Sequence, residues 1–262
     1  MYFKRKIGVI VPAHNEENFI LGVVGSMPDY VDRIYVVNDA STDRTLELVS
    51  GEVVRNSKLA LINRQARGGV GAAIFTGHSE ALKDGIDVMV VMAGDGQMDP
   101  AHLNRFIEPI INGKADYVKG NRLSNHQDIK EMPMGRIVGN FLLTNLTRVA
   151  SGYWNISDPQ NGYTAISANT LRKLDMDKIE HGFAFENDML VKLNAAGARV
   201  IDIQHPAIYR GQNSKIRYPG FIVRTSWVLF KDTFWRIWVK YLVNHRDRNP
   251  DDELAENEIE IK

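Results

Sequence analysis

The chain of 262 residues is long enough to bury one substantial core, and no shift in composition divides it into two independent domains. Its 32 basic residues balance 32 acidic ones, which excludes a global field that would gather nucleic acid and requires any electrostatic function to be local. The absence of cysteine excludes disulfides, thiolate metal sites and cysteine nucleophiles.

The first part of the chain alternates short apolar runs with helix-like stretches. Strands are predicted at 7–11, 34–37, 59–62 and 88–92, and helices between them at 16–26, 43–49 and 70–83. This alternation predicts an α/β fold, with a mostly parallel Rossmann-like sheet and helices on both faces. In such sheets ligands bind beyond the carboxyl ends of the strands, so the loops that follow the strands are expected to carry the chemistry.

Beyond about residue 120 the pattern is less regular. Helices are predicted at 135–150 and 186–196 and a strand at 199–203, and this half is expected to extend the sheet and form the acceptor side. From 221 to 243, apolar and aromatic residues recur at three- and four-residue steps, which predicts a long amphipathic helix. We therefore expect a catalytic domain over 1–220, an amphipathic interfacial helix over 221–243 and a polar, acid-rich tail over 244–262.

The hydrophobic pattern also bears on location. No run of 18 uncharged apolar residues exists to cross a bilayer, and the apolar run at 7–11 is too short for a signal-peptide core. We expect a cytoplasmic protein that is peripheral on the cytoplasmic face of a membrane, with helix 221–243 lying in the interface. The alternative is that the same apolar stripe packs on the sheet or forms a dimer, and the sequence leaves the oligomeric state open.

Polar, turn-forming loops follow the four predicted strands. They read VPAHNEE (11–17), NDASTD (38–43), NRQARGGVG (63–71) and MAGDGQMDP (92–100). Asp95 and Gln97, after the fourth strand, offer the oxygen ligands that magnesium and manganese prefer. Any α/β protein also uses such residues to cap helices and form turns, so a single loop decides little.

Together, VPAHNEE, NDASTD and Asp95-Gly96-Gln97 resemble the strand-end motifs of family 2 glycosyltransferases with the GT-A fold. Within that family the chain most resembles the enzymes that load sugars onto dolichyl or other polyprenyl phosphates, and the resemblance covers residues 5–220. It implies an inverting transfer from a UDP- or GDP-sugar to a lipid-linked acceptor, with Mg²⁺ or Mn²⁺ as cofactor.

The resemblance assigns roles on the donor side by position. It implies that the nucleoside pocket, the donor contacts and the metal site use Pro12, Ala13, Asn15, Glu17, Asp39, Arg67, Gly71, Asp95 and Gln97. Glu17 would lie near the ribose, Asp39 would face the base, and Asp95 with Gln97 would hold the metal. The family's metal motif reads Asp-x-Asp, and here Ala93 stands where the first aspartate would be.

The acceptor side is assigned in the same way. The resemblance places Asn161, Gly162 and Tyr163 at the acceptor, Glu186 and Asp188 as the acidic motif, and Arg210, Ser214 and Lys215 at a phosphate. A hydroxyl acceptor of a growing glycan would need a general base, for which Asp188 is the candidate, whereas a phosphate acceptor is already an oxyanion. The sequence leaves open two alternatives: that Asp188 caps a helix, and that Arg210 and Lys215 are ordinary surface charges.

Two other functional classes would explain parts of this sequence. A nicotinamide-dependent dehydrogenase would explain Gly69-Val70-Gly71 before a helix, but Ile74 stands at the third glycine position and the match follows the third strand instead of the first. A non-catalytic nucleotide-binding module stays open because Ala93 breaks the metal motif.

Overall fold

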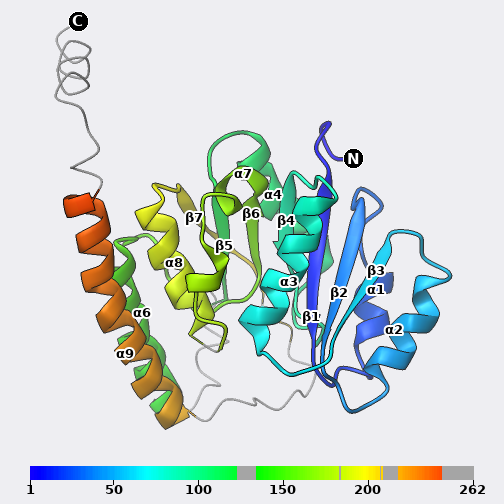
Figure 1. Ribbon diagram of the computed structural model, residues 1–262, viewed down its shortest axis with the longest axis horizontal. Coiled ribbons are helices and arrows are strands. Elements are labelled where there is room, and N and C mark those ends of the chain that lie inside the picture. Colours follow the sequence, from blue (N-terminus) through cyan, green and yellow to red (C-terminus); the bar gives the residue numbers. More distant parts are fainter. Residues whose placement is uncertain (123–133, 183, 207, 209–217, 244–262) are drawn as a thin grey trace, which may run out of the picture.

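The computed structural model describes residues 1–262 except 123–133, 183, 207, 209–217 and 244–262. Seven strands form one sheet in the order β3-β2-β1-β4-β6-β5-β7 (Figure 1). Their bounds are β1 (Ile7–Ala13), β2 (Arg33–Asp39), β3 (Leu59–Arg64), β4 (Val88–Val91), β5 (Tyr117–Asn121), β6 (Thr164–Ser167) and β7 (Val200–Gln204). Of the strands that the structure describes, only β6 runs antiparallel to its neighbours, so the sheet is mostly parallel as predicted.

Helices cover both faces of this sheet. They are α1 (Ile20–Gly25), α2 (Thr45–Val53), α3 (Val70–Lys83), α4 (Leu103–Ile111), α6 (Met134–Ser151), α7 (Ala168–Leu171), α8 (Phe185–Ala195) and α9 (Tyr218–Ile237), with short 3₁₀ turns η1 (Pro100–His102) and η2 (Met176–Lys178). The chain after α9 continues as a π-helical turn, η3 (Trp238–Val243).

The core divides into two layers, one on each face of the sheet. Side chains of α1, α2 and α4 pack on one face with Val9 and Val11 of β1, whereas α3, α7 and α8 pack on the other face with Ile10. Successive residues of a strand point to opposite faces, so a strand covered on both sides is apolar throughout, as β1 and β4 are. This is why their continuous apolar runs identify them in the sequence.

The fold places the carboxyl ends of β1, β2 and β4 side by side, because β1 pairs in parallel with both of the others. Helix α3 has the predicted bounds, whereas α1 is shorter than predicted because residues 16–19 form a turn that leads into it. Within the described part of the chain, no helix is both long and apolar enough to cross a membrane.

Helix α9 is part of the body of the protein. It lies against α6 and α8 at the edge of the molecule beyond β7 (Figure 1). Its first residue is Tyr218, and Gly220 and Phe221 in its first turn line a cleft at the carboxyl ends of the strands.

Candidate active site

A cleft of about 850 Å³ opens between the strand ends and the first turns of α9. Its lining residues come from the ends of β1, β2 and β4, the loop before α3, the segment before α8, and α9. They are Pro12, Ala13, His14, Glu16, Asp39, Arg67, Gly69, Val70, Ala73, Ala93, Gly94, Asp95, Gly182, Ala184, Gly220, Phe221, Arg224 and Thr225. Five of the predicted donor-side residues are among them: Pro12, Ala13, Asp39, Arg67 and Asp95.

Asn15 does not line the cleft and instead joins two loops. Its backbone has φ 58°, a left-handed conformation that asparagine tolerates. The Asn15 Oδ1 accepts a hydrogen bond from the Thr42 amide at 2.8 Å, and the Asn15 amide donates to Ser41 Oγ at 3.0 Å. Thus the loop after β1 is held against the loop after β2.

Glu17 is also not among the residues that line the cleft, and its place near the ribose stays a prediction. Its Oε2 accepts from the Arg44 amide at 3.1 Å, at the start of α2. His14 and Glu16 line the cleft instead, and His14 Nδ1 lies 2.8 Å from the Asp39 carbonyl oxygen. Sequence reasoning missed both, because alternate residues of this irregular loop face different neighbours.

Asp39 lies at the cleft wall with 3% exposure, and its carboxylate shapes the next loop. Oδ1 accepts from Arg64 Nε and from the Gly68 amide, each at 2.9 Å, and Oδ2 accepts from the Gly69 amide at 2.9 Å. Charge-assisted bonds of this kind are stronger than neutral ones. The carboxylate therefore fixes the path of residues 64–69, which carries Arg67 to the cleft.

Gly71 packs against backbone and is not among the residues that line the cleft, so its position along the donor stays a prediction. A Cβ added there would lie 2.9 Å from the His181 carbonyl oxygen and 3.0 Å from that of Glu180. The Gly71 amide donates to the same His181 oxygen at 3.0 Å. The glycine thus lets the first turn of α3 approach the segment before α8 closely.

Asp95 lines the cleft beyond the end of β4, next to Ala93 and Gly94. Its Oδ1 accepts a hydrogen bond from the Gln97 amide at 3.0 Å, which forms a tight turn, and Gln97 itself is not among the lining residues. No group of three or more His, Cys, Asp or Glu side chains gathers to hold a metal ion in the described part of the chain. A carboxylate in an open cleft still fits a magnesium or manganese ion that takes its other ligands from phosphates and water.

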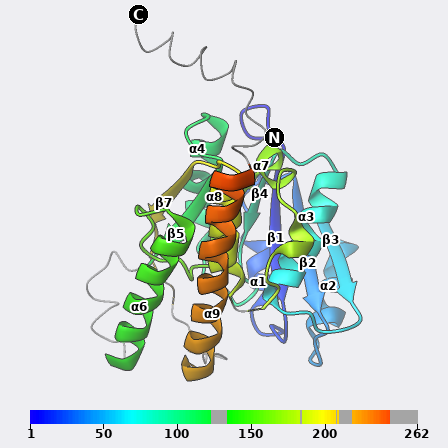
Figure 2. The same cartoon turned by 60° about the vertical axis from the view of Figure 1, so that its left-hand side comes forward.

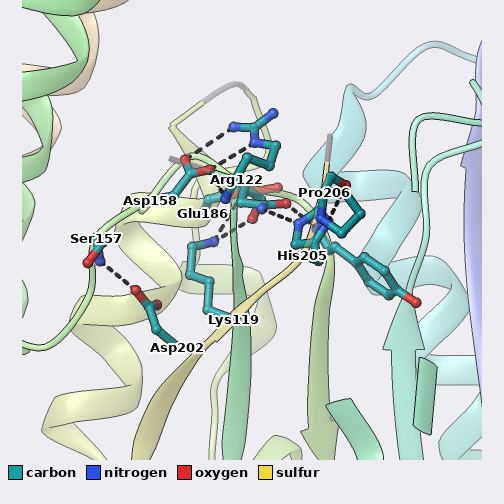
Figure 3. Close-up of polar contacts among 10 residues, drawn as sticks. Lys119, Arg122, Ser157, Asp158, Glu186, Asp202, His205 and Pro206 are labelled. Atoms are coloured by element: carbon teal, nitrogen blue, oxygen red, sulfur yellow. Dashed lines mark hydrogen bonds and ion pairs between the residues drawn. The ribbon is translucent and has the colours of Figure 1, made fainter. Parts of the chain in front are cut away.

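A buried polar cluster lies at the ends of β5 and β7, beside the start of α8 (Figure 3). Lys119 of β5 has no exposed surface, donates from Nζ to the Asn161 carbonyl oxygen at 2.6 Å, and lies 4.0 Å from Glu186 Oε2. Arg122 makes a two-point contact with Asp158, at 2.8 Å and 3.1 Å. Nothing in the sequence signalled this cluster, because Lys119 and Gly120 interrupt the apolar pattern of β5.

Burial sets the protonation of this cluster. Loss of solvent raises the pKa of Glu186 to about 7, an effect that Lys119 and Arg122 oppose. Burial likewise raises the pKa of Asp202 to about 6 and lowers the pKa of Lys119. At Asp158 burial acts in the same upward direction, but the charge and hydrogen bonds of Arg122 outweigh it and lower the pKa. Among the residues that the structure describes, none forms a hydrogen bond with the buried Glu186 Oε2.

The predicted acceptor residues divide between this cluster and the core. Asn161 Nδ2 lies 2.7 Å from Nε2 of His205, and its Oδ1 accepts from the Tyr163 amide. Tyr163 is fully buried and stacks on Phe106 at 3.9 Å between ring centroids, so it is a core residue. Gly162 lies beside Glu186, because a Cβ built on it would be 3.3 Å from Glu186 Oε1.

Asp188 takes part in a different network. It is 3% exposed, its Oδ2 accepts from the Glu180 amide at 2.7 Å, and its Oδ1 lies 3.2 Å from Lys192 Nζ. Lys192 also contacts Asp232 of α9 at 3.4 Å. Asp188 therefore connects α8 to the segment before it, at Glu180, and through Lys192 to α9. It is not among the residues that line the cleft. The remaining predicted residues, Arg210, Ser214 and Lys215, lie outside the described residues.

Comparison with known proteins places this geometry in a family. The model of "Glycosyl transferase family 2" matches residues 8–175, which include the ends of β1, β2 and β4. The chain belongs to this family. It is a glycosyltransferase, and both the resemblance and the fold class predicted from the sequence are confirmed.

Among its relatives is the UDP-N-acetylglucosamine–dolichyl-phosphate N-acetylglucosaminyltransferase of Methanococcus voltae, 34% identical over 64% of this chain and 72% of that one. The undecaprenyl-phosphate mannosyltransferase of Micrococcus luteus is 29% identical over 76% and 82%. The solved glucosyl-3-phosphoglycerate synthase of Mycobacterium tuberculosis, in complex with Mn²⁺ and UDP-glucose, superposes with a TM-score of 0.64 at 20% identity over 89% of this chain and 79% of that one. This superposition shows that the two proteins share the GT-A fold.

Proposed function

We propose that this glycosyltransferase moves a sugar from a UDP- or GDP-sugar to a polyprenyl or dolichyl phosphate, as a peripheral enzyme at the cytoplasmic face of a membrane. One observation carries the donor half: a single cleft collects Pro12, Asp39 and Asp95 from three adjacent strand ends. The acceptor half is supported by the relatives, which are named for dolichyl and undecaprenyl phosphate.

The reaction breaks the bond between the sugar C1 and the donor diphosphate and forms a bond between C1 and an acceptor phosphate oxygen. Attack from the face opposite the leaving diphosphate inverts the configuration at C1. The acceptor is already an oxyanion, so no side chain has to remove a proton. A divalent cation held by Asp95 would supply positive charge to the leaving diphosphate.

The residues of the chain contribute shape and charge. Asp39 holds the loop that carries Arg67 to the cleft, and Arg224 lines the cleft from α9, where it is paired with Glu180 at 2.7 Å. Arginine suits phosphate because its planar donors match two oxygens at once. We expect these two side chains to orient the donor diphosphate and to screen its charge.

The proposal is tested with the full chain, a short-chain polyprenyl phosphate and radiolabelled UDP- or GDP-sugars with manganese. Asp95→Asn is expected to reduce transfer on the order of 100-fold, because an amide neutralises the cation less well than a carboxylate. Ala93→Asp, which restores the family motif, is expected to leave donor binding intact. Transfer by Asp95→Asn at the wild-type rate, with the same manganese dependence, would exclude Asp95 as a ligand.

Glu186 supports a second candidate, transfer to a hydroxyl group. Its pKa of about 7 and its position beside Gly162 suit a general base, whereas Asp188 is engaged by Glu180 and Lys192. Under this alternative, Glu186→Gln would abolish transfer to a hydroxyl acceptor. Under the phosphate proposal, Glu186→Gln retains transfer to polyprenyl phosphate.

A further inference from the structure

The outer side of α6 and α9 carries large apolar side chains that the protein does not bury. On α9 and the first residue of η3 they are exposed by 43–72%, and on α6 by 47–72%. The residues are Val223, Trp227, Phe230, Phe234, Ile237 and Trp238, together with Phe141, Leu142 and Val149. We call this set the α6–α9 face. Contiguous exposed apolar surface of this kind marks a site of interaction with a protein or a membrane.

Helix α9 packs on the protein through a side with both polar and apolar residues, and its most aromatic side is exposed. Its buried residues include Thr225 and Asp232 along with Val228 and Leu229. Asp232 lies 3.4 Å from Lys192 of α8, and Arg236 Nε donates to the Ala150 carbonyl oxygen of α6 at 2.7 Å. These polar contacts fix the rotation of the helix, so the aromatic stripe predicted from the sequence does not pack on the sheet.

The two helices are in contact along their length. They lie side by side on the outside of the molecule (Figure 2) and run in parallel, since Gly139 lies against Ile222 near their starts and Ala150 against Arg236 near their ends. Trp227 stacks on Phe230 at 5.9 Å, and Phe230 meets Phe234 edge to face at 5.0 Å. The stripe follows the length of α9, which at 20 residues is about 30 Å.

The charges along this face are positive. Arg224, Lys231 and Lys240 are exposed, and Arg224 is paired with Glu180 at 2.7 Å, so the lysines supply the positive charge. The single acidic residue of the sequence from 218 to 243 is Asp232, which is buried. The sequence of α6 contains no acidic residue. Tryptophan and phenylalanine beside cations suit the boundary between lipid headgroups and acyl chains, where the rings enter the apolar layer and the cations meet lipid phosphates.

The face is continuous with the cleft. Gly220, Phe221, Arg224 and Thr225, in the first turns of α9, line the cleft, and Val223 and Trp227 of the same turns lie on the α6–α9 face. A lipid-linked phosphate can therefore enter the cleft while its chain stays in the apolar layer beside α9. This step rests on the proposed function, whereas the exposed apolar surface does not.

We propose that the α6–α9 face docks flat on an anionic lipid bilayer, with both helices in the interface and the cleft opening at its edge. The occupant is the bilayer itself, because the exposed Lys231 and Lys240 beside the aromatic stripe match anionic headgroups, whereas a second copy of the same face would bring these like charges together.

The test is flotation of the full chain with vesicles of phosphatidylcholine and phosphatidylglycerol that contain no polyprenyl phosphate. The triple variant Trp227→Ser, Phe230→Ser and Phe234→Ser is expected to bind at least tenfold more weakly than the wild type. The matched control, Phe3→Ser with Val54→Ser, removes exposed apolar side chains elsewhere, 72% and 88% exposed, and is expected to bind as the wild type does. Nucleotide binding by all three proteins reports that the fold is kept.

Equal flotation of the triple variant and the wild type would overturn the proposal, as would a wild type that does not float. A wild type that is dimeric by light scattering, does not float, and becomes monomeric in the triple variant would assign the face to a second copy. Failure of the proposed function has a different signature: vesicles would bind the protein, but polyprenyl phosphate in them would receive no sugar.

Discussion

Glu186 offers a quantitative test of the polar cluster through its protonation. Its pKa rises from an ordinary 4.5 to about 7, chiefly because burial disfavours the carboxylate. Between these two values the folded protein keeps a proton that the unfolded chain has lost, so the free energy of unfolding decreases as the pH rises. A shift of this size corresponds to about 3 kcal/mol, because each pKa unit is worth about 1.4 kcal/mol. The side chain is 12% exposed, so solvent screens little of this effect.

Glu186→Gln removes this titration while keeping the shape of the protonated acid. We expect the variant and the wild type to be equally stable near pH 4.5, and the variant to be about 3 kcal/mol more stable at pH 8. Urea unfolding at pH 4.5, 6, 7 and 8 measures the difference, with equal m values as the check on two-state behaviour. The matched control is Glu80→Gln, an exposed residue paired with Lys83, for which we expect a difference near zero at every pH.

Two outcomes would refute this reasoning. A difference that does not change with pH would mean that Glu186 titrates at its ordinary pKa in the folded protein. A variant that is less stable than the wild type at pH 8 would mean that the attraction of the Glu186 carboxylate to Lys119 exceeds the cost of burying it.

Two further substitutions test the architecture of the cleft. Asp39→Asn leaves one acceptor oxygen for three N–H donors. We expect the free energy of unfolding, measured in urea, to decrease by about 1–3 kcal/mol, and UDP or GDP binding, measured by calorimetry, to weaken. If both quantities are unchanged, Asp39 does not organise this loop. Gly71→Ala places a methyl group 2.9 Å from the His181 carbonyl oxygen, and we expect it to lower the free energy of unfolding by about 1–3 kcal/mol. Gly51→Ala in α2 meets no described atom within 4 Å, and we expect it to raise the free energy of unfolding by about 0.5–1 kcal/mol. Equal effects of the two alanines would contradict the close approach at Gly71.

The sequence predicted the sheet well where strands are covered on both faces. The apolar runs of β1, β2, β3 and β4 fall within two residues of their observed bounds, and α3 is matched at both ends. Strands β5 and β6 and helix α4 were not predicted. In β5 the apolar pattern is broken by Lys119 and Gly120, and the glycine is required because a Cβ there would lie 2.7 Å from His205 Nε2. A buried charge with tertiary partners has no signature in hydrophobic periodicity.

The candidate site divides in the same way. Motif spacing predicts which loops meet, because parallel strands end at the same edge of the sheet. It does not predict which side chain of a loop turns to the cleft and which to the neighbouring loop. Asn15, with its positive φ, turns to Thr42, while His14 and Glu16 on either side of it line the cleft. The acidic motif shows the same ambiguity, because Glu186 and Asp188 enter two separate networks from one helical turn.

The position of α9 determines where this protein can be divided. Arg236 Nε and Nη2 donate to the carbonyl oxygens of Ala150 and Val149, so α9 satisfies the end of α6. Thr225 forms part of the cleft wall, and Asp232 shares Lys192 with Asp188. A boundary at residue 220 would cut through the cleft, remove the donors to two carbonyl groups of α6 and remove Asp232 from Lys192 of α8. A unit that keeps both the cleft and these contacts therefore extends at least to Arg236, and α9 cannot be exchanged between relatives without its partners on α6 and α8.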